Sequence, residues 1–261
     1  MSYEVPTRAL PALCELFLQD VQPVVLLGAG ASFPSVPTAA QLTRRIAERR
    51  FRSEYGFPSD VAVDPDQLRA FLARHAWYRP EEDEADQYPA FVRNFLTPQV
   101  TRRDFLRAEM TGKIPNAGHL AFARLAQAKA VRIFLTTNFD DLLYDALNET
   151  AGTRAVRFDT PQGFGSFNSS DPEPKVVYLH GSVDFYMDRN TDEEVRSLDD
   201  AFLEKLPHVL DEHPLVVIGY RGAEPSVMER LLIGRAKAAG NYKRGIWWCR
   251  FRKEHHQNPR L

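Results

Sequence analysis

The chain has 261 residues and a formal net charge of -2, with 44% hydrophobic and 26% charged residues. Such a composition is ordinary for a soluble globular protein. The balance of charge excludes a general basic field that would hold the phosphates of a nucleic acid, so no direct nucleic-acid binding is expected.

The residue content also disfavours metal-binding and membrane proteins. The two cysteines, Cys14 and Cys249, form no C-x-x-C pair, which argues against a thiolate zinc site. The acidic run at residues 81–84 is typical of a solvated loop, so no metal is expected. No apolar run approaches the ~20 residues of a membrane helix, and no signal peptide is recognisable. A cytoplasmic protein without membrane contact is therefore predicted.

The first part of the chain predicts one strand followed by a mainly helical segment. Apolar spacing indicates a helix over residues 8–20, and the aliphatic run at 24–27 is typical of a strand buried on both faces. Thr38 is a suitable N-cap for a helix that reaches about residue 50. Strand-like runs then disappear. We interpret residues 51–115 as a helical insertion that forms a small second lobe, with helices expected at 66–75, 86–96 and 101–110.

Strands and helices alternate beyond residue 115. The predicted strands are 131–136, 154–158, 175–179, 215–218 and 245–249. The predicted helices are 118–128, 139–149, 198–210 and 224–239, and residues 160–174 are predicted to be a loop. This alternation implies parallel strands with right-handed helical crossovers, which is a doubly wound, Rossmann-like α/β sheet. One domain is expected over residues 1–261. Its polar end at 250–261 suggests the front part of a longer protein.

In an open parallel sheet, ligands bind at the carboxyl ends of the strands. The first predicted strand is followed by a turn of small residues: Gly28, Ala29, Gly30, Ala31 and Ser32. Such a turn lets the backbone approach a phosphate closely and offers amide groups to an anion. The alternative is a tight strand-to-helix turn that holds no ligand.

Polar or glycine residues also follow three other predicted strands. Asn138 comes after the second, between Thr137 and Asp140, and either Asn138 or Asp140 could simply cap the next helix. His180 follows the strand at 175–179, where a histidine can be a general base or can hold a turn. After the strand at 215–218, Gly219 permits close approach, and Tyr220 or Arg221 could cover a ribose or a phosphate. Each signal is weak alone, but the four strand ends converge on one crevice.

These motifs resemble those of the sirtuin superfamily in order and spacing. The resemblance rests on the glycine turn, on Asn138 with its neighbours, and on His180 with Gly181, and it covers residues 24–248. Residues 219–228 resemble the fourth motif of the bacterial sirtuin-like domains of antiphage defence proteins, which degrade NAD. The chain departs from protein-deacylating sirtuins because it lacks their four-cysteine zinc module, and its helical insertion is larger than expected for a minimal sirtuin.

The resemblance implies that NAD is the substrate, without a metal, and that the nicotinamide N-glycosidic bond is hydrolysed. It assigns the catalytic roles to Asn138 and His180. The remaining expected contacts lie along the dinucleotide. They are the glycine turn for the pyrophosphate, Pro37, Thr38 and Asp140 towards the nicotinamide, and Tyr220 and Ser226 towards the adenosine. Gly219 permits close approach, and Thr137 lies beside Asn138.

Several alternatives remain open at this point. The domain could sense NAD or an ADP-ribose derivative without cleaving it, it could be a zinc-free deacylase or ADP-ribosyltransferase, or it could be an inert scaffold lobe. An enzyme that destroys NAD must be held inactive until it is triggered. We therefore expect control by homo-oligomerisation or by a regulatory partner protein or domain. The sequence does not identify the trigger.

Overall fold

The computed structural model of the chain describes residues 9–150, 152–182, 200–237 and 240–249. Its centre is a sheet of six parallel strands in the order β3-β4-β2-β1-β5-β6. The strands are β1 (Val24–Leu27), β2 (Ile133–Thr136), β3 (Val156–Phe158), β4 (Lys175–Tyr178), β5 (Leu215–Ile218) and β6 (Ile246–Cys249). The predicted doubly wound parallel sheet is confirmed.

The strand order reverses at the centre of the sheet. From β1 the chain moves to β2, β4 and β3 on one side, and it later returns to place β5 and β6 on the other side. In a doubly wound sheet, the crevice outside the carboxyl ends of the strands at such a reversal is the usual place for a ligand. The site is therefore to be sought where β1, β2 and β5 end.

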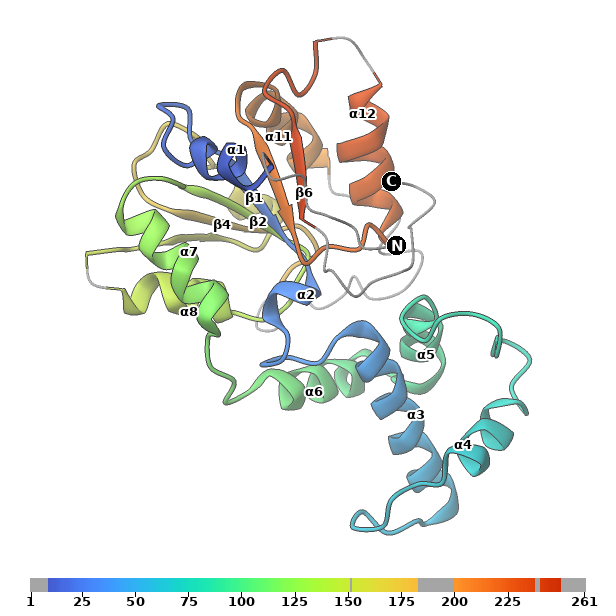
Figure 1. The fold of residues 1–261 in the computed structure, drawn as a ribbon. Helices are drawn as coiled ribbons and strands as arrows, with labels where there is room; N and C mark the ends of the chain where they lie inside the picture. Colours follow the sequence, from blue (N-terminus) through green and yellow to red (C-terminus); the bar gives the residue numbers. More distant parts are fainter. Residues whose placement is uncertain (1–8, 151, 183–199, 238–239, 250–261) are drawn as a thin grey trace.

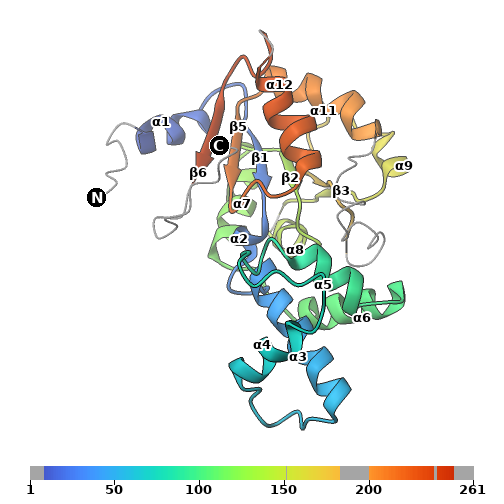
Figure 2. The ribbon, with the colours of Figure 1, turned by 90° about the vertical axis from the view of Figure 1, so that its right-hand side faces the viewer.

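Helices cover both faces of the sheet because the central strands are apolar on both faces. On one face Leu26, Leu135 and Val217 pack against α9 (Pro161–Phe164), α11 (Asp200–Glu212) and η1 (Ser226–Ile233). On the other face Phe134 and Tyr178 pack with α1 (Ala9–Leu16), α7 (Ala117–Gln127) and α8 (Leu142–Glu149). Figures 1 and 2 show α7 and α8 on the side of the sheet opposite α11 and α12 (Gly234–Ala236).

A separate apolar cluster holds the helical segment together. It is formed by α3 (Ala39–Tyr55), α4 (Pro65–Leu72), α5 (Tyr88–Phe95) and α6 (Gln99–Met110), which Figure 1 shows beneath the sheet. Leu42 and Ile46 of α3 belong to this cluster. The packed helical unit thus begins with α3, whereas the sequence was interpreted as an insertion from about residue 51.

The differences from the predicted elements lie mainly at their ends. The helix predicted over 139–149 begins only at Leu142, because residues 137–141 form an irregular connection after β2 in which Asp141 has φ −98° and ψ 9°. The loop predicted at 160–174 contains the short helix α9, which is capped by Thr160. The helix predicted over 224–239 starts as the π-helix η1. The polar end predicted at 250–261 lies outside the described residues. Within the part of the chain described, no helix is long and apolar enough to cross a membrane.

The ends of β1 and β5 meet backbone to backbone. The Gly28 amide donates to the Ile218 carbonyl over 3.1 Å, and the Gly30 amide donates to the Gly219 carbonyl over 2.9 Å. Gly219 has a φ of 65°, and a Cβ there would lie 2.3 Å from the Ala31 nitrogen. A glycine at this position is therefore required both by backbone conformation and by space.

The variant Gly219→Ala tests this constraint against Gly56→Ala. Gly56 has nearly the same φ, 61°, but a Cβ there would meet nothing within 4 Å. Urea unfolding should show a loss of about 1–2 kcal/mol for Gly56→Ala, from the left-handed backbone alone. Gly219→Ala should lose more than about 3 kcal/mol, since the clash with backbone is added. Equal losses in the two variants would contradict the packing argument.

Candidate functional site

Asn138 joins the ends of β1 and β2. The strand register continues for one residue beyond β2, since the Thr137 amide donates to the Leu27 carbonyl over 3.0 Å. The Asn138 side-chain nitrogen then donates to the Gly28 carbonyl over 3.1 Å and to Ser32 Oγ over 3.0 Å. The structure thus brings together the glycine turn and the asparagine that the sequence singled out separately.

The glycine turn forms the short helix α2 (Ala29–Ser32). Its small residues are first of all a packing requirement, because a Cβ on Gly28 would lie 2.5 Å from Tyr220 Cα. The Gly30 amide donates to Gly219, and the Ala31 amide donates to the Gly28 carbonyl over 2.9 Å. With the Gly28 amide, which donates to Ile218, three of the amides that the sequence assigned to an anion are therefore used inside the protein. Ala29 and Gly30 are exposed, so this side of the turn faces outward.

Asp140 caps the following helix and also contacts Ser32. Its carboxylate accepts from the Leu142 amide over 3.2 Å and hydrogen bonds with the Ser32 hydroxyl. Burial is the larger effect and raises the pKa of Asp140 to about 6, although both hydrogen bonds act to lower it. Of the two candidate caps, Asp140 accepts a hydrogen bond from the first residue of the helix and Asn138 does not, although the N-cap position itself is Asp141. The same carboxyl group is also part of the polar cluster around Ser32.

His180 lies at the neighbouring strand end. It is 2% exposed and precedes Gly181, whose φ of 82° turns the chain away from the sheet. The pairing of Thr136 with Tyr178 brings Asn138 and His180, each two residues further on, to adjacent strand ends. The structure thus places an asparagine and a histidine at adjacent strand ends along the carboxyl edge of the sheet.

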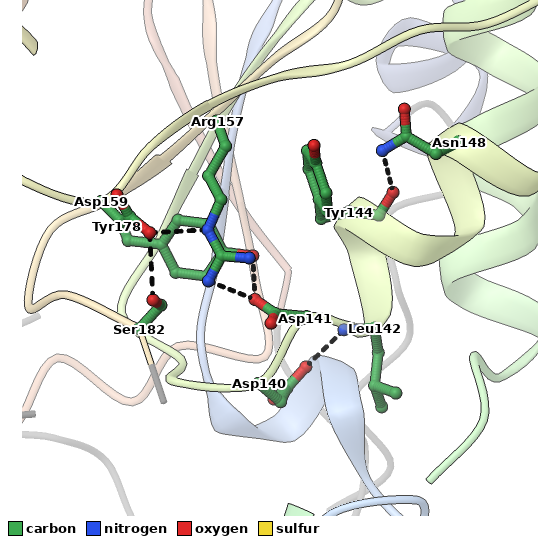
Figure 3. A network of polar contacts seen from close by, with 9 residues as sticks. All are labelled: Asp140, Asp141, Leu142, Tyr144, Asn148, Arg157, Asp159, Tyr178 and Ser182. Carbon is green, nitrogen blue, oxygen red and sulfur yellow. Dashed lines mark hydrogen bonds and ion pairs between the residues drawn. The ribbon is translucent and has the colours of Figure 1, made fainter. Parts of the chain in front are cut away.

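A charged network beneath this edge was not predicted from the sequence (Figure 3). Arg157 of β3 pairs with Asp141 at 2.9 Å and with Asp159 at 2.7 Å. Ser182 Oγ donates to Asp159 over 3.1 Å, and the Tyr178 hydroxyl donates to Asp141 over 2.8 Å. The guanidinium carbon also lies 4.9 Å from the centre of the Tyr178 ring. The network holds Ser182, and with it the chain just after His180, against the ends of β3 and β4.

One sequence signal could have indicated this network. A charged residue inside a predicted strand is expected to have a partner, and two aspartates, Asp141 and Asp159, lie before and after Arg157 in the chain. The pairing itself depends on the strand order, which places β3 beside β4. It could not be read from local spacing.

The other predicted contact residues are mostly buried. Tyr220 is 5% exposed, and its ring lies 5.8 Å from that of Trp248 within the core, which differs from the expected cover over a ribose. Ser226 is fully buried at the start of η1. Pro37 is buried, and Thr38 is the N-cap of α3, where its amide donates to Gln41 over 2.9 Å.

The helical segment reaches the rim of the site through one arginine. Arg221, just after the end of β5, pairs with Asp86 at 2.7 Å and with Asp83 at 3.5 Å, in the loop before α5. These exposed pairs link the two parts of the molecule beside Gly219, although each contributes little stability. In the described residues, no group of three or more histidine, cysteine or acidic side chains is arranged to hold a metal ion.

Comparison with known proteins gives the class of the domain. Residues 132–261 match the family model of the SIR2-like domain. This stretch contains Asn138 and His180 but not the glycine turn. The chain therefore contains a sirtuin-like domain. No curated relative matches the chain.

Solved sirtuin structures are similar over most of the chain. "Structure of Sir2Tm bound to a propionylated peptide" is 16% identical, covers 87% of this chain and 82% of its own, and has a TM-score of 0.41. "Sir2 bound to acetylated peptide" is 15% identical with the same coverage and a TM-score of 0.42. "Sir2-p53 peptide-NAD+" is 15% identical, covers 86% and 82%, and has a TM-score of 0.39. Similarity at this level transfers no activity or ligand to the chain.

The network of Figure 3 predicts a stability difference between two arginines. Arg157, Asp141 and Asp159 have side chains only 16%, 18% and 14% exposed. Arg157→Gln should therefore lower the free energy of unfolding by about 2–3 kcal/mol, because two carboxylates lose their partner. The control is Arg44→Gln, which breaks the exposed pair with Glu48 and should cost less than about 0.5 kcal/mol. Similar losses in urea unfolding would contradict the structural role of Arg157.

The buried Asp140 carboxyl predicts a pH dependence of stability. Its pKa is about 6 in the folded chain against an ordinary value of 3.8, so the folded state holds the proton more strongly. Its contribution to stability is present at low pH and is lost as the pH rises through about 6, by up to about 3 kcal/mol. His119 acts oppositely, since burial lowers its pKa to about 4.

The variant Asp140→Asn separates the two groups. The difference in free energy of unfolding, wild type minus Asp140→Asn, should become more negative between pH 4 and pH 7. Chemical unfolding at several pH values measures it. A difference that stays constant with pH would show that Asp140 has no raised pKa.

Proposed function

We propose that this chain binds NAD at the carboxyl edge of its sheet and hydrolyses the bond between nicotinamide and ribose. The observation that carries the proposal is the pair of adjacent strand ends that bear Asn138 and His180. A general base and a polar group that orients a hydroxyl are the two components that hydrolysis of this bond requires from the protein.

The state of the Asn138 amide supports this assignment. Its nitrogen donates to Gly28 and Ser32, which uses both of its hydrogens. Its oxygen is buried and has no hydrogen-bond partner in the described structure. A buried acceptor without a partner is unfavourable, so such atoms are commonly completed by a ligand or water. A ribose hydroxyl or the attacking water is a donor of the kind that fits.

The reaction balances with these residues alone. Water attacks C1′ of the nicotinamide ribose, the carbon–nitrogen bond breaks, and its electron pair leaves with nicotinamide, which becomes neutral. His180 takes one proton from the water and later releases it to solvent. Asn138 Oδ1 accepts from a ribose hydroxyl or from the water and so orients it. The products are nicotinamide, ADP-ribose and a proton.

The remaining assignments follow the direction of the dinucleotide. In this proposal the pyrophosphate lies along the exposed side of the turn at Ala29 and Gly30, and Gly219 lets it approach the end of β5. Asp140 bounds the nicotinamide side together with two residues before α3, Pro37 and Thr38. On the adenosine side, Ser226 offers a buried hydroxyl without a recorded partner, and Tyr220 supports the wall from within the core.

The proposed biological role is depletion of NAD by a toxic effector in antiphage defence, inside the cytoplasm. The support is the resemblance of residues 219–228 to the fourth motif of such domains. Assembly of several copies, or contact with a partner protein or domain, would then release the activity.

Product analysis tests the proposed activity. The protein is incubated with NAD, and nicotinamide, ADP-ribose, cyclic ADP-ribose and modified protein are quantified. Equal amounts of nicotinamide and ADP-ribose are expected. Binding of NAD without free nicotinamide would instead mean a sensor, and labelled protein would mean transfer.

Two pairs of variants test the residues. Asn138→Ala and His180→Ala should each lower the rate of nicotinamide release by about 100-fold or more, since each removes a group that acts in the transition state. The controls are Asn94→Ala and His208→Ala, which remove the same chemical groups from exposed positions on α5 and α11. Circular dichroism should show folded protein in all four. Full activity in either site variant would contradict the mechanism.

A further inference from the structure

The N-terminus of α7 contacts the end of the glycine turn through two side chains. Asn116, the N-cap of α7, donates from its side-chain nitrogen to the Ala31 carbonyl over 2.8 Å and to the Phe33 carbonyl over 3.2 Å. His119, three residues later, places Nε2 at 3.4 Å from Ser32 Oγ. His119 is 2% exposed. One turn of α7 therefore contacts the residues before, at and after Ser32.

The hydrogen bonds of this group can run in only one direction. The Asn116 backbone amide is necessarily a donor, and it lies 3.2 Å from His119 Nδ1. Nδ1 is therefore unprotonated. Burial lowers the pKa of His119 to about 4, so the neutral ring carries its hydrogen on Nε2 at ordinary pH and donates it to Ser32 Oγ.

The direction of the bond from His119 determines how the Ser32 hydroxyl bonds to the other residues of the site. Its oxygen accepts from His119 and from the Asn138 amide. Its own hydrogen must then point to the remaining acceptor, which is the Asp140 carboxyl. The other groups that act on this carboxyl are the amides of Leu142 and of Asp140 itself and the neighbouring Asp141 carboxylate.

We propose that His119 is a positioning residue of this site: acting through the Ser32 hydroxyl, it fixes the orientation of the Asn138 amide and the hydrogen bond to Asp140. If His119 carried its hydrogen on Nδ1 instead, the Ser32 hydroxyl would donate to His119 Nε2. It could then no longer donate a hydrogen bond to Asp140. The hydrogen bonds from His119 and Asn138 to Ser32, and from Ser32 to Asp140, together keep the Asn138 oxygen turned towards the ligand. The kinetic part of the proposal rests on the proposed hydrolysis of NAD, whereas the hydrogen-bond direction does not.

Two substitutions of His119 distinguish the roles of its two ring nitrogens. The side-chain oxygen of His119→Asn can replace Nδ1 and keep the contact with Asn116, but it leaves Ser32 without its donor. The side-chain nitrogen of His119→Gln can replace Nε2 and keep the donor to Ser32. Both leave a polar group in the same buried place, so a purely structural role of His119 would affect them alike.

The first measurement is nuclear magnetic resonance of the full chain. Nitrogen-15 shifts should show His119 neutral, with its hydrogen on Nε2, between pH 5 and pH 8. Carbon-13 shifts should give an Asp140 titration midpoint near 6. The midpoint should rise by about half a pKa unit or more in Ser32→Ala and should rise in His119→Asn, but not in His119→Gln, because a hydrogen bond to the charged form is lost or weakened.

The second measurement is the kinetics of nicotinamide release. His119→Asn should lower kcat about 10-fold or more with KM changed less than about 3-fold, since orientation matters most in the transition state. His119→Gln should recover most of kcat. A hydrogen on Nδ1, or equal effects of the two substitutions on both kcat and the Asp140 midpoint, would overturn the proposal. Absence of NAD cleavage in the wild type would instead overturn the proposed function, and the resonance data would still decide the role of His119.

Discussion

The close contact between the ends of β1 and β5 is the constraint on which the site depends. Gly219 meets the backbone of the turn after β1 with no room for a side chain. Because the two strands are held so closely, the turn forms backbone hydrogen bonds with the end of β5. It is also bound by the Asn116 side chain at the N-terminus of α7. Ser32 is thereby placed where side chains from two other elements converge on it. The glycines that first suggested a phosphate site are needed to build this arrangement, whatever ligand it holds.

The polar residues of the site lie in a single layer above the apolar sheet. The four central strands are buried except for Ile218 at the end of β5, and Asn138 and His180 follow the last paired residues of β2 and β4. In this low-dielectric setting, hydrogen bonds are strong and unpaired groups are unfavourable. That explains why Asp140 has a raised pKa and why the Asn138 oxygen without a partner is informative. The network around Arg157 fixes the neighbouring strand ends, so the layer is supported from below.

The sequence predicted those features that depend on local pattern. Alternating apolar runs gave the parallel sheet, and the rule on strand ends brought Asn138 and His180 to one edge. Features that depend on side chains meeting across the fold were missed. His119 was seen only as part of a predicted helix, although an asparagine three residues before a histidine is a possible capping pair. Tyr220 was expected at the surface of the site, but the approach of β5 to β1 places its ring in the core.

The central claim is that the carboxyl edge of the sheet is the NAD site. The most direct test is to titrate the cleavage-deficient His180→Ala variant with NAD. Nuclear magnetic resonance would follow the side-chain amide of Asn138 and the backbone amide of the exposed residue Gly30. The account predicts that both signals shift together and saturate at the same concentration, while signals from α4 at the far end of the helical segment do not move. Saturable binding that shifts α4 and leaves Asn138 and Gly30 unchanged, or no binding at all, would contradict it.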